Sequence, residues 1–580
     1  MASLTRGPPD RDAYATACNA HLCLTLSVHA HTHREATAMI EVEGRTLGQV
    51  WDLAVERYGN NSFLACPADE ERAYHPGGYE VTYAEAAAFV DRCCEALATA
   101  GFGHRHRVAL DMENRPEHFL FKLALNRLGI SCVPLNPDLR PAEVAYVFDD
   151  STPALAIVSA HRVDAFERAL AESAQSFPHV VMESFPRDLP EAANLAPDTG
   201  PIDAATEACL LYTSGTTGRP KGCIVSHEYE LMMGEWYVTR GGLMTVREGK
   251  ERLYNPLPIF HINSLVVSFM AMLLTGNCQI QPARFSRSAW WRDICETRAT
   301  VIHYLGIVAP VLMNTPPGAY DTAHTVRFGF GAGIEPTLHA AFEERFGFPL
   351  IEGWGMTEMC RIFADCAGPR DVDTRAIGGP SSGLEARIVD ESDKELPRDT
   401  PGELTIRYSA EEPRKGAFSG YLNQPDATEE AWRGGWFHTG DTVTQDAEGT
   451  IFFVDRKKNI IRRSGENISA AEVEACLLGH DAVGQAAVLA VEDDVRDEEV
   501  YACVVAAAGA APGRALADDL FTYCFERIAH YKAPGWLLFV DDLPVTGTQK
   551  VQKDKLFGEE DDPTSLSGVF DFRDRKRKRP

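Results

Sequence analysis

One stretch of twelve residues, Leu211 to Gly222, constrains this chain more than any other, and its letters are LYTSGTTGRPKG. The apolar run at 208–212 leads into it and predicts a short buried strand. Gly215, Gly218 and Gly222 then let the backbone turn tightly and bring its N–H groups close to a ligand. Because successive backbone N–H groups form a cradle for anions, the stretch predicts a loop that binds a polyphosphate.

The side chains of this loop suit phosphate as well. Lys221 adds a positive charge, and hydroxyl donors come from Thr213, Ser214, Thr216 and Thr217. The loop differs from a Walker A loop, in which Gly-Lys-Ser/Thr opens a helix, because here the lysine lies between Pro220 and Gly222. A plain Ser/Gly/Thr turn between two strands is the alternative, and the order of these residues argues against it.

The length of the chain requires more than one hydrophobic core. At 580 residues, two or more domains are expected. Apolar residues make up 45% and charged residues 24%, which is typical of a globular protein. The net charge of −28 disfavours nonspecific binding to nucleic acids. The basic run at 573–579 is an exception, and we interpret it as a frayed, solvated chain end rather than an interaction arm.

The fifteen cysteines form no C-x-x-C pair, and we interpret them as buried, reduced thiols of a cytoplasmic protein. The best candidate for a membrane span, Leu265 to Leu274, has about ten residues and is too short to cross a bilayer. The first residues of the chain are polar and do not indicate a signal peptide. We therefore expect a protein without a membrane span.

Residues 1–38 show no periodicity and predict a poorly ordered extension. The alternating histidines at 29–33 have no accompanying cysteine or carboxylate cluster, so no metal site is predicted there. An interpretable pattern starts after Met39, where Thr46 to Val55 predicts an N-capped amphipathic helix. Strand and helix patterns then alternate, for example a strand at 108–110 and a helix at 116–128. This alternation predicts α/β layers with parallel sheet.

Two glycine-rich strands follow the phosphate loop. The first, at 328–333, lacks the third glycine of a dinucleotide fingerprint. In the second, at 350–358, glycines flank Trp354 and leave a flat slot for a purine. Thr357 and Glu358 come next and can face phosphate and Mg²⁺. Close-packed turns without a ligand are the alternative for both strands.

A histidine and a basic run complete the set of candidate features. His261 lies between Phe260 and Ile262, where a satisfied core histidine is the alternative to a role in a site. The stretch at 453–468 carries five basic residues within the eight positions 456–463, which alone would indicate a solvated face. The stretch ends in Ser-Gly-Glu-Asn-Ile.

Taken together, six motifs occur in the order typical of the adenylate-forming superfamily, which contains acyl-CoA synthetases, luciferases and the adenylation domains of peptide synthetases. The chain resembles this superfamily over residues 40–560, most clearly at 211–222, 350–358, 436–441, 453–468 and 543–553. The run at 491–499 and the Gly465-Glu466-Asn467 form are most similar to the crotonobetaine/carnitine-CoA ligase branch.

The resemblance implies an α/β fold with two domains. Residues 39–456 are expected to form a large ATP- and acid-binding domain of layered α/β subdomains. Residues 457–560 are expected to form a small, mobile α+β domain with its hinge near Lys458, and 561–580 a basic tail.

The resemblance also implies the site residues of the large domain. Those assigned to the nucleotide are Thr213, Ser214, Gly215, Thr216, Thr217, Gly218, Lys221, Gly331, Ala332, Gly333, Gly353, Trp354, Gly355, Met356, Asp441 and Arg456. Asp441 would hold the ribose, since a carboxylate can accept hydrogen bonds from both vicinal hydroxyls. Thr357 and Glu358 are assigned to phosphate, Glu358 also to Mg²⁺, and His261 to the carboxylate pocket.

In the small domain the resemblance assigns catalysis to Lys550, the hinge to Lys458, and the thiol-acceptor tunnel to Ser464, Gly465 and Glu466. The family usually has glycine immediately before the catalytic lysine, and this chain has Gln549 there. Glutamine in place of glycine affects the backbone geometry of that loop and does not change the charge of the lysine.

The function that the resemblance implies is ligation of a carboxylic acid to coenzyme A. ATP and the acid would give an acyl-adenylate and pyrophosphate, and CoA would then give a thioester and AMP. Loading of a carrier-protein phosphopantetheine, oxidation as in luciferases, and a non-catalytic nucleotide-binding role are the alternatives. The expected cofactors are ATP, Mg²⁺ and coenzyme A. The expected partners are small molecules and not nucleic acids, with a homodimer as one assembly, and the acid itself is not identified.

Overall fold

The structure of the chain is a computed structural model. It describes residues 39–192, 197–213, 219–306, 308–334, 336–456, 460–544, 553, 556–558 and 562–576. The extension predicted at 1–38 lies outside this part of the chain, while residues 39–580 form one compact unit. Within the described residues, no helix has the length and apolar character needed to span a membrane.

The first large sheet carries the strands on both sides of the predicted phosphate loop. Its order is β17 (Gly420–Tyr421), β8 (Lys221–Ser226), β7 (Glu207–Thr213), β4 (Ser131–Pro134), β3 (Arg107–Asp111), β5 (Leu155–Val158) and β6 (His179–Val181). Strands β7, β4, β3, β5 and β6 are parallel, whereas β8 pairs antiparallel with β7 and β17 with β8. The parallel arrangement predicted from alternating strands and helices is therefore present here.

The second large sheet carries both glycine-rich strands. Its order is β14 (Phe363–Ala364), β13 (Leu350–Trp354), β12 (Phe328–Ala332), β11 (Val301–Leu305), β9 (Arg252–Tyr254), β10 (Cys278–Ile280), β1 (Ser62–Cys66) and β2 (Tyr79–Thr82). All neighbouring pairs are parallel except the two edge strands, β14 and β2. Because the carboxyl ends of parallel strands meet at one edge, β12 and β13 deliver their glycines to the same place.

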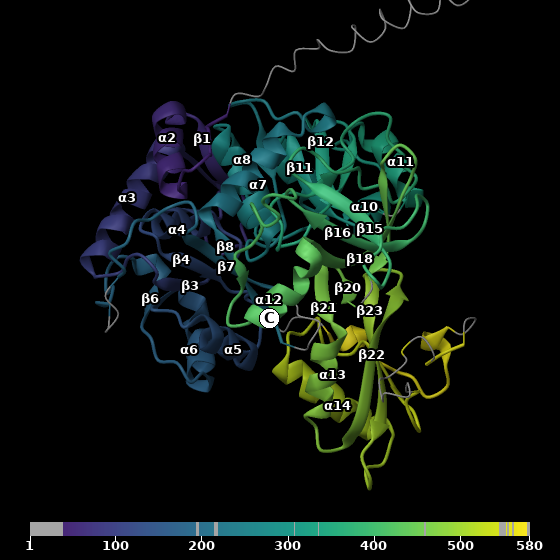
Figure 1. Ribbon diagram of the computed structural model, residues 1–580. Coiled ribbons are helices and arrows are strands. Elements are labelled where there is room, and N and C mark those ends of the chain that lie inside the picture. The colour runs from purple at the N-terminus through teal and green to yellow at the C-terminus, as the bar shows by residue number, and fades with distance from the viewer. Residues whose placement is uncertain are drawn as a thin grey trace, which may run out of the picture. The chain divides into compact units, whose positions relative to one another are not determined.

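Helices cover these sheets and fill the space between them. They are α2 (Leu47–Tyr58), α3 (Tyr83–Thr99), α4 (Pro116–Arg127), α5 (Pro141–Ser151), α6 (Val163–Glu172), α7 (His227–Thr239), α8 (Phe269–Leu274), α9 (Trp290–Glu296), α10 (Val308–Met313) and α11 (Pro336–Phe346). Figure 1 shows α4, α7 and α8 among the strands of these sheets. Every residue of α8 is buried, and α4 and α7 are buried almost all round. Side chains of both sheets join these three helices in one core.

Local signals explain where several of these helices begin. Thr46 caps α2 through a capping box with Gln49, as the sequence predicts. Thr82 and Glu85 form the same box at the start of α3. Inside the core, Lys122 of α4 and Glu230 of α7 form a fully buried ion pair at 2.7 Å. Although burial opposes it, Glu230 raises the pKa of Lys122, so the lysine stays charged.

A third, antiparallel sheet completes the large domain. It consists of β15 (Glu385–Val389), β16 (Gly402–Arg407), β18 (Phe437–Gln445) and β19 (Ile451–Arg456), with α12 (Pro425–Ala431) preceding β18. Asp441 lies in β18 opposite Arg456 of β19. The sheet thus places two predicted nucleotide residues side by side on neighbouring strands.

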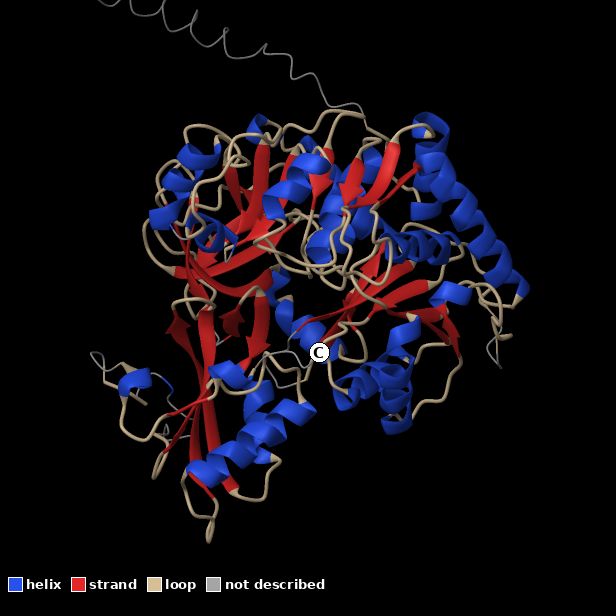
Figure 2. Cartoon of the chain, turned by 180° about the vertical axis from the view of Figure 1, so that it is seen from behind, coloured by secondary structure: helices blue, strands red, loops and turns tan. Residues whose placement is uncertain are grey.

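The small domain has its own core. Its sheet contains β20 (Ile460–Arg463), β21 (Glu466–Ser469), β22 (Val483–Asp493), β23 (Asp497–Ala506), β24 (Trp536–Phe539) and β25 (Phe570–Asp571). Helices α13 (Ala470–Leu478) and α14 (Arg514–Arg527) pack on it, and their buried side chains form a separate hydrophobic cluster (Figure 2). The hinge predicted at Lys458 lies outside the described residues.

The chain end differs from the expected frayed, solvated segment. Strand β25 pairs with β24, and the buried ring of Phe572 stacks on Phe521 with centroids 4.8 Å apart. Lys576 is buried and forms an ion pair with Glu499. The basic composition suggested solvation, but the apolar residues interleaved with the charges anchor positions 570–576 to the small domain.

Candidate functional site

A cavity of about 1150 Å³ brings most of the predicted site residues together. Those that line it are Thr213, Lys221, His261, Gly331, Ala332, Gly353, Trp354, Gly355, Met356, Thr357, Glu358, Asp441, Gly465 and Glu466. Gly333 and Ser464 lie just beyond this lining. Residues 214–218, Lys458 and Lys550 lie outside the described part of the chain, as does the side chain of Arg456.

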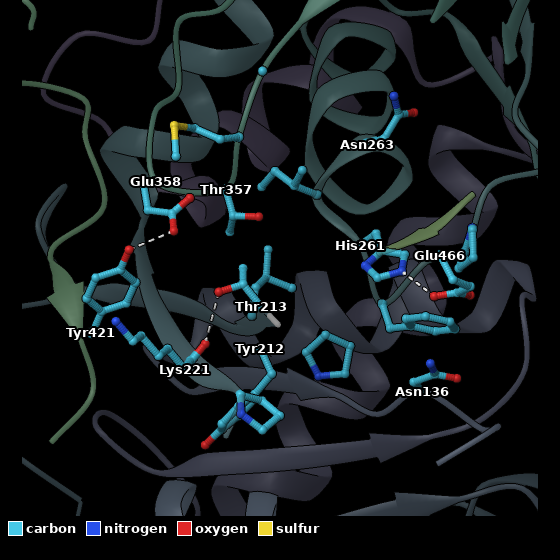
Figure 3. Close-up of a pocket in the computed structure, with 18 of the residues that line it drawn as sticks. Asn136, Tyr212, Thr213, Lys221, His261, Asn263, Thr357, Glu358, Tyr421 and Glu466 are labelled. Carbon is cyan, nitrogen blue, oxygen red and sulfur yellow. Dashed lines mark hydrogen bonds and ion pairs between the residues drawn. The ribbon is translucent and has the colours of Figure 1, made fainter. Parts of the chain in front are cut away.

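The two ends of the phosphate loop are fixed by a strand pair. Strand β7 ends at Thr213 and β8 begins at Lys221, and these two residues face each other in the antiparallel register. The hydroxyl of Thr213 donates to the backbone oxygen of Lys221 at 3.5 Å (Figure 3). At Gly222 a Cβ atom would lie 3.1 Å from Leu210, so close packing below the loop favours glycine.

A cation, a phenol and a carboxylate lie in a row at one side of the cavity. The ammonium group of Lys221 lies 4.7 Å from the ring centroid of Tyr421, within the range of a cation–π contact. The hydroxyl of Tyr421 donates to Oε1 of the buried Glu358 at 2.8 Å (Figure 3). Burial and then the charge of Glu358 raise the pKa of Tyr421, which keeps the hydroxyl protonated as a donor.

The backbone around Glu358 is held as firmly as its side chain. Its carbonyl accepts a hydrogen bond from the N–H of Phe418 at 2.9 Å. The carbonyl of Thr357 accepts one from the hydroxyl of Tyr229, also at 2.9 Å. Hydrogen bonds within the protein therefore hold the Glu358 carboxylate and the backbone at 357–358 in place.

These groups fit a magnesium ion that arrives with phosphates. No cluster of three His, Cys, Asp or Glu side chains suited to a metal occurs among the described residues. Mg²⁺ commonly uses one or two carboxylates and completes its shell with water and substrate phosphates. One buried carboxylate on the cavity wall, beside a hydroxyl and a lysine, matches that kind of site rather than a cage made by protein alone.

The slot predicted for a purine is made by close backbone packing. A Cβ atom at Gly353 would lie 2.7 Å from the ring of Phe330, and one at Gly355 would lie 2.6 Å from Ile362. Trp354 between them stacks on Phe363, with ring centroids 5.2 Å apart. The two glycines are therefore required by space, and the tryptophan is fixed on the cavity wall.

Trp354 and Asp441 are directly joined. The indole Nε1–H donates to Oδ2 of Asp441 at 2.8 Å, and both side chains are buried. The backbone N–H of Asp441 donates to the Thr439 hydroxyl at 3.1 Å, while Gly440 has φ of +72° and donates to Glu403. A carboxylate has about four lone-pair positions, which is more than the bond from Trp354 uses.

Glu352 is a residue that the sequence interpretation missed and that holds two glycine-rich strand ends together beside the cavity. Its buried carboxylate accepts hydrogen bonds from the backbone N–H groups of Gly333 and Ile334, at 2.8 and 3.3 Å, and from the Tyr304 hydroxyl. Burial raises the pKa of this carboxyl group. Glu352 ties the end of β13 to the turn after β12, and its only signal was an acidic residue inside an apolar strand.

The cavity lining includes an apolar wall and, among its polar points, one that belongs to a hydrogen-bonded network. Met233, Val267, Phe330 and Ile362 form the wall, and all four are buried. The polar point is Asn263, whose Oδ1 lies 2.7 Å from Nδ1 of His303 and accepts from Asn255 at 3.0 Å. Burial lowers the pKa of His303 to about 3, so this imidazole is neutral.

The small domain reaches the cavity through the turn at 464–466. Nε2 of His261 lies 3.6 Å from Oε2 of Glu466 (Figure 3). Gly465 has φ of +88°, and a Cβ atom there would lie 2.8 Å from Leu305. Both the left-handed backbone and the lack of space favour glycine at this contact.

Comparisons with known proteins agree with the order of the motifs. A family model described as "AMP-binding enzyme" matches residues 56–422, and one described as "AMP-binding enzyme C-terminal domain" matches residues 472–550. The crotonobetaine/carnitine–CoA ligase of Salmonella arizonae is 30% identical over 534 residues, which cover 89% of this chain and 99% of that protein. The ligase of the same name from Escherichia coli strain ATCC 8739 is also 30% identical, over 533 residues.

Solved structures share the arrangement of a large and a small domain. The o-succinylbenzoate CoA synthetase of Bacillus subtilis matches with a TM-score of 0.75 at 23% identity, covering 88% of this chain and 98% of that one. The amide bond synthetase McbA of Marinactinospora thermotolerans matches with 0.73 at 25%, covering 88% and 99%. A malonyl-CoA ligase with methylmalonyl-CoA and AMP bound matches with 0.67 at 28%, covering 84% and 97%.

Proposed function

Because this chain belongs to the family of AMP-binding enzymes and is an AMP-forming acid–CoA ligase, we propose that the cavity described above holds ATP, the acid and the thiol in turn. The observation that carries the proposal is the convergence of Lys221, Glu358 and the Trp354–Asp441 pair on one cavity. These groups match a triphosphate, its metal ion and a nucleoside in the order in which ATP presents them.

In the first step, the carboxylate of the acid attacks the α-phosphorus of ATP and pyrophosphate leaves. The reaction needs no general base, because a carboxylate is already ionised at neutral pH. Positioning and neutralisation of spread negative charge supply most of the acceleration in such transfers. We assign the positioning to the 213–222 loop, Thr357 and Asp441, and the positive charge to Lys221 and Lys550. Mg²⁺ bound beside Glu358 would add further neutralisation.

In the second step, the thiol of coenzyme A attacks the carbonyl carbon of the adenylate. The C–S bond forms, the C–O bond to AMP breaks, and the thiol proton leaves to solvent or a nearby base. The mixed anhydride makes this step easy, since AMP is a good leaving group. We assign Ser464, Gly465 and Glu466 to the approach of the thiol, and His261 to the carboxylate pocket.

The two steps would use different orientations of the small domain, with Lys458 as the hinge. In the observed orientation, Gly465 and Glu466 line the cavity. Lys553, close to Lys550 in the chain, instead binds Glu474 at 2.6 Å and the carbonyl of Val488 at 2.7 Å within the small domain. This arrangement supports an orientation suited to the thioester step, and a rotation that brings Lys550 inward for adenylation.

The apolar wall favours an acid whose acyl group is uncharged. The named relatives act on crotonobetaine and carnitine, which carry a quaternary ammonium group. Such a cation is usually held by several aromatic faces or by a carboxylate. Here Glu230, one helical turn from Met233 of the wall, is already paired with Lys122. We therefore propose a neutral, largely apolar acyl group for this chain.

A test is to incubate the chain with ATP, Mg²⁺, coenzyme A and a panel of neutral carboxylic acids, and to measure pyrophosphate, AMP and thioester. Equal amounts of AMP and pyrophosphate that depend on the acid are expected. Lys221→Met should remove most of this activity, whereas Lys250→Met, on the exposed surface, should not. Release of ADP and phosphate would contradict the proposal. Activity only with a phosphopantetheine carrier protein would favour the carrier-loading alternative.

The remaining parts of the proposal concern place and assembly. The thirteen cysteines among the described residues form no disulfide bonds, which supports a location of the protein in the cytoplasm. A homodimer stays a prediction from the sequence, and sedimentation of the purified chain can test it.

A further inference from the structure

The contact between the large and small domains contains a buried ion cluster that the proposed chemistry does not use. Nζ of Lys532, which follows α14, lies 2.8 Å from Oε1 of Glu143 and 2.7 Å from Oε1 of Glu472. Glu143 belongs to α5 of the large domain and Glu472 to α13 of the small domain. The three side chains are 7%, 12% and 10% exposed, in the order given. One ammonium group is thus held by a carboxylate from each domain.

Lys532 stays charged although it is buried. Burial opposes the charge of Lys532, but Glu143 and Glu472 together raise its pKa well above the usual value. Burial raises the pKa of Glu472 to about 7, with Lys532 acting against the shift and Glu143 adding to it. Lys532 and Glu472 belong to the same domain and would move together. Of the two ion pairs that Lys532 makes in this cluster, rotation of the small domain would therefore break the one with Glu143 and keep the one with Glu472.

Neighbouring residues of the large domain contact the small domain in the same place. Asn136 donates to the hydroxyl of Tyr531 at 3.1 Å. Arg140 donates to the carbonyl of Ile528 at 3.1 Å, and its guanidinium group lies 4.9 Å from the ring centroid of Phe525. Leu139 packs against the hydrophobic core of the small domain. The segment at 136–143 thus contacts the small domain at four positions, and Asn136, Leu139 and Glu143 also line the cavity.

We infer that this segment, residues 136–143 with Glu143 as its charged member, is a docking clasp for the small domain. It stabilises the orientation in which Gly465 and Glu466 line the cavity. The inference rests on the proposed function, which assigns the thioester step to that orientation. Glu143 is a positioning residue, because it acts on the fraction of molecules in this orientation and not on the reacting groups.

The variant Glu143→Gln tests the clasp with little change to α5. Glu143 is the third residue of the helix, and its side chain accepts a hydrogen bond from the backbone N–H of Arg140 at 2.9 Å. Glutamine keeps an oxygen for that capping bond and removes only the charge. Glu85→Gln is a matched control, because Glu85 holds the same position in α3 and accepts from the N–H of Thr82 at 2.8 Å.

Two half-reactions and amide hydrogen exchange give the readout. Glu143→Gln should form thioester from supplied acyl-adenylate and CoA about tenfold more slowly, which corresponds to about 1.4 kcal/mol. Release of pyrophosphate from ATP and acid should be unchanged or faster. Exchange at 136–146 and 528–533 should rise in this variant and not in Glu85→Gln.

Equal slowing of both half-reactions in Glu143→Gln would overturn the inference, because it would indicate a general structural defect. Behaviour identical to that of Glu85→Gln in all three measurements would overturn it as well. If the unchanged chain made no thioester with any acid, the proposed function would fail. Hydrogen exchange would still decide the clasp, since unaltered exchange at 528–533 in Glu143→Gln would refute it.

Discussion

Replacing Asp441 by alanine tests the nucleotide site most informatively, because a comparison variant can separate its proposed role toward ribose from its bond to Trp354. Toward ATP, we expect it to accept both ribose hydroxyls, and hydrogen bonds to a charged acceptor contribute about 1.5–3 kcal/mol each. Loss of both should lower kcat/KM for ATP by about 10²- to 10⁴-fold. Toward the protein, it accepts the indole N–H of Trp354 at 2.8 Å. A buried donor left without a partner costs about 1–3 kcal/mol of stability.

The assay is the initial rate of pyrophosphate release over a range of ATP concentrations, together with urea unfolding of the same samples. Trp354→Phe is the comparison, since it removes the indole N–H and keeps the carboxylate. We expect its loss in kcat/KM for ATP to stay below about tenfold, the effect of about 1.4 kcal/mol. An unchanged kcat/KM for ATP in Asp441→Ala would refute the ribose assignment. Equal losses in the two variants would show that Asp441 acts only by holding Trp354.

Three further predictions follow from other parts of the chain. Lys122→Met should lower the free energy of unfolding by about 3–5 kcal/mol, because it leaves the buried charge of Glu230 unpaired. Urea unfolding of Lys122→Met and of the double variant Lys122→Met/Glu230→Leu measures this change. The double variant should recover most of the loss, and failure to do so would contradict the ion-pair explanation. Crotonobetaine should be a poorer substrate than its neutral isostere, in which a carbon atom replaces the quaternary nitrogen. Faster pyrophosphate release with crotonobetaine would contradict the proposal that the acyl group is neutral. A chain that starts at Met39 should keep its yield and turnover, and loss of folded protein would show that residues 1–38 contribute to the fold.

Local patterns in the sequence predicted the elements beside the site well. The apolar run at 208–212 corresponds to β7, and the cap at Thr46 begins α2 as expected. The strand at 108–110 and the helix at 116–128 correspond to β3 and α4. In each case, neighbouring residues carry the signal, either as a periodic apolar face or as a capping side chain.

Contacts between distant residues were not predictable in this way. Tyr421 lies 63 positions from Glu358, to which it donates, and nothing local links the two. Lys532 meets Glu143 across 389 positions. Phe572 becomes part of the small-domain core, although the charges around it suggested a solvated end. Such pairings depend on the folded topology, which a single sequence read locally does not contain.

Most residues that the resemblance assigned to the site line one cavity, because the family's motifs lie at strand ends that converge there, and the roles assigned to them stay predictions. Glu352 was missed, since its partners are backbone N–H groups of Gly333 and Ile334, which have no side-chain signal. Lys550 and the centre of the phosphate loop lie outside the described residues, so their assigned roles stay predictions.

We expect the chain to form an adenylate and then a thioester with different faces of its small domain. The most direct measurement follows both half-reactions in Lys550→Ala, by pyrophosphate release and by CoA consumption from synthetic acyl-adenylate. Adenylate formation should nearly disappear while thioester formation from the supplied adenylate persists, and Lys458→Pro should show the reverse, because proline fixes φ where the hinge must turn. Equal slowing of both half-reactions in both variants would contradict the claim.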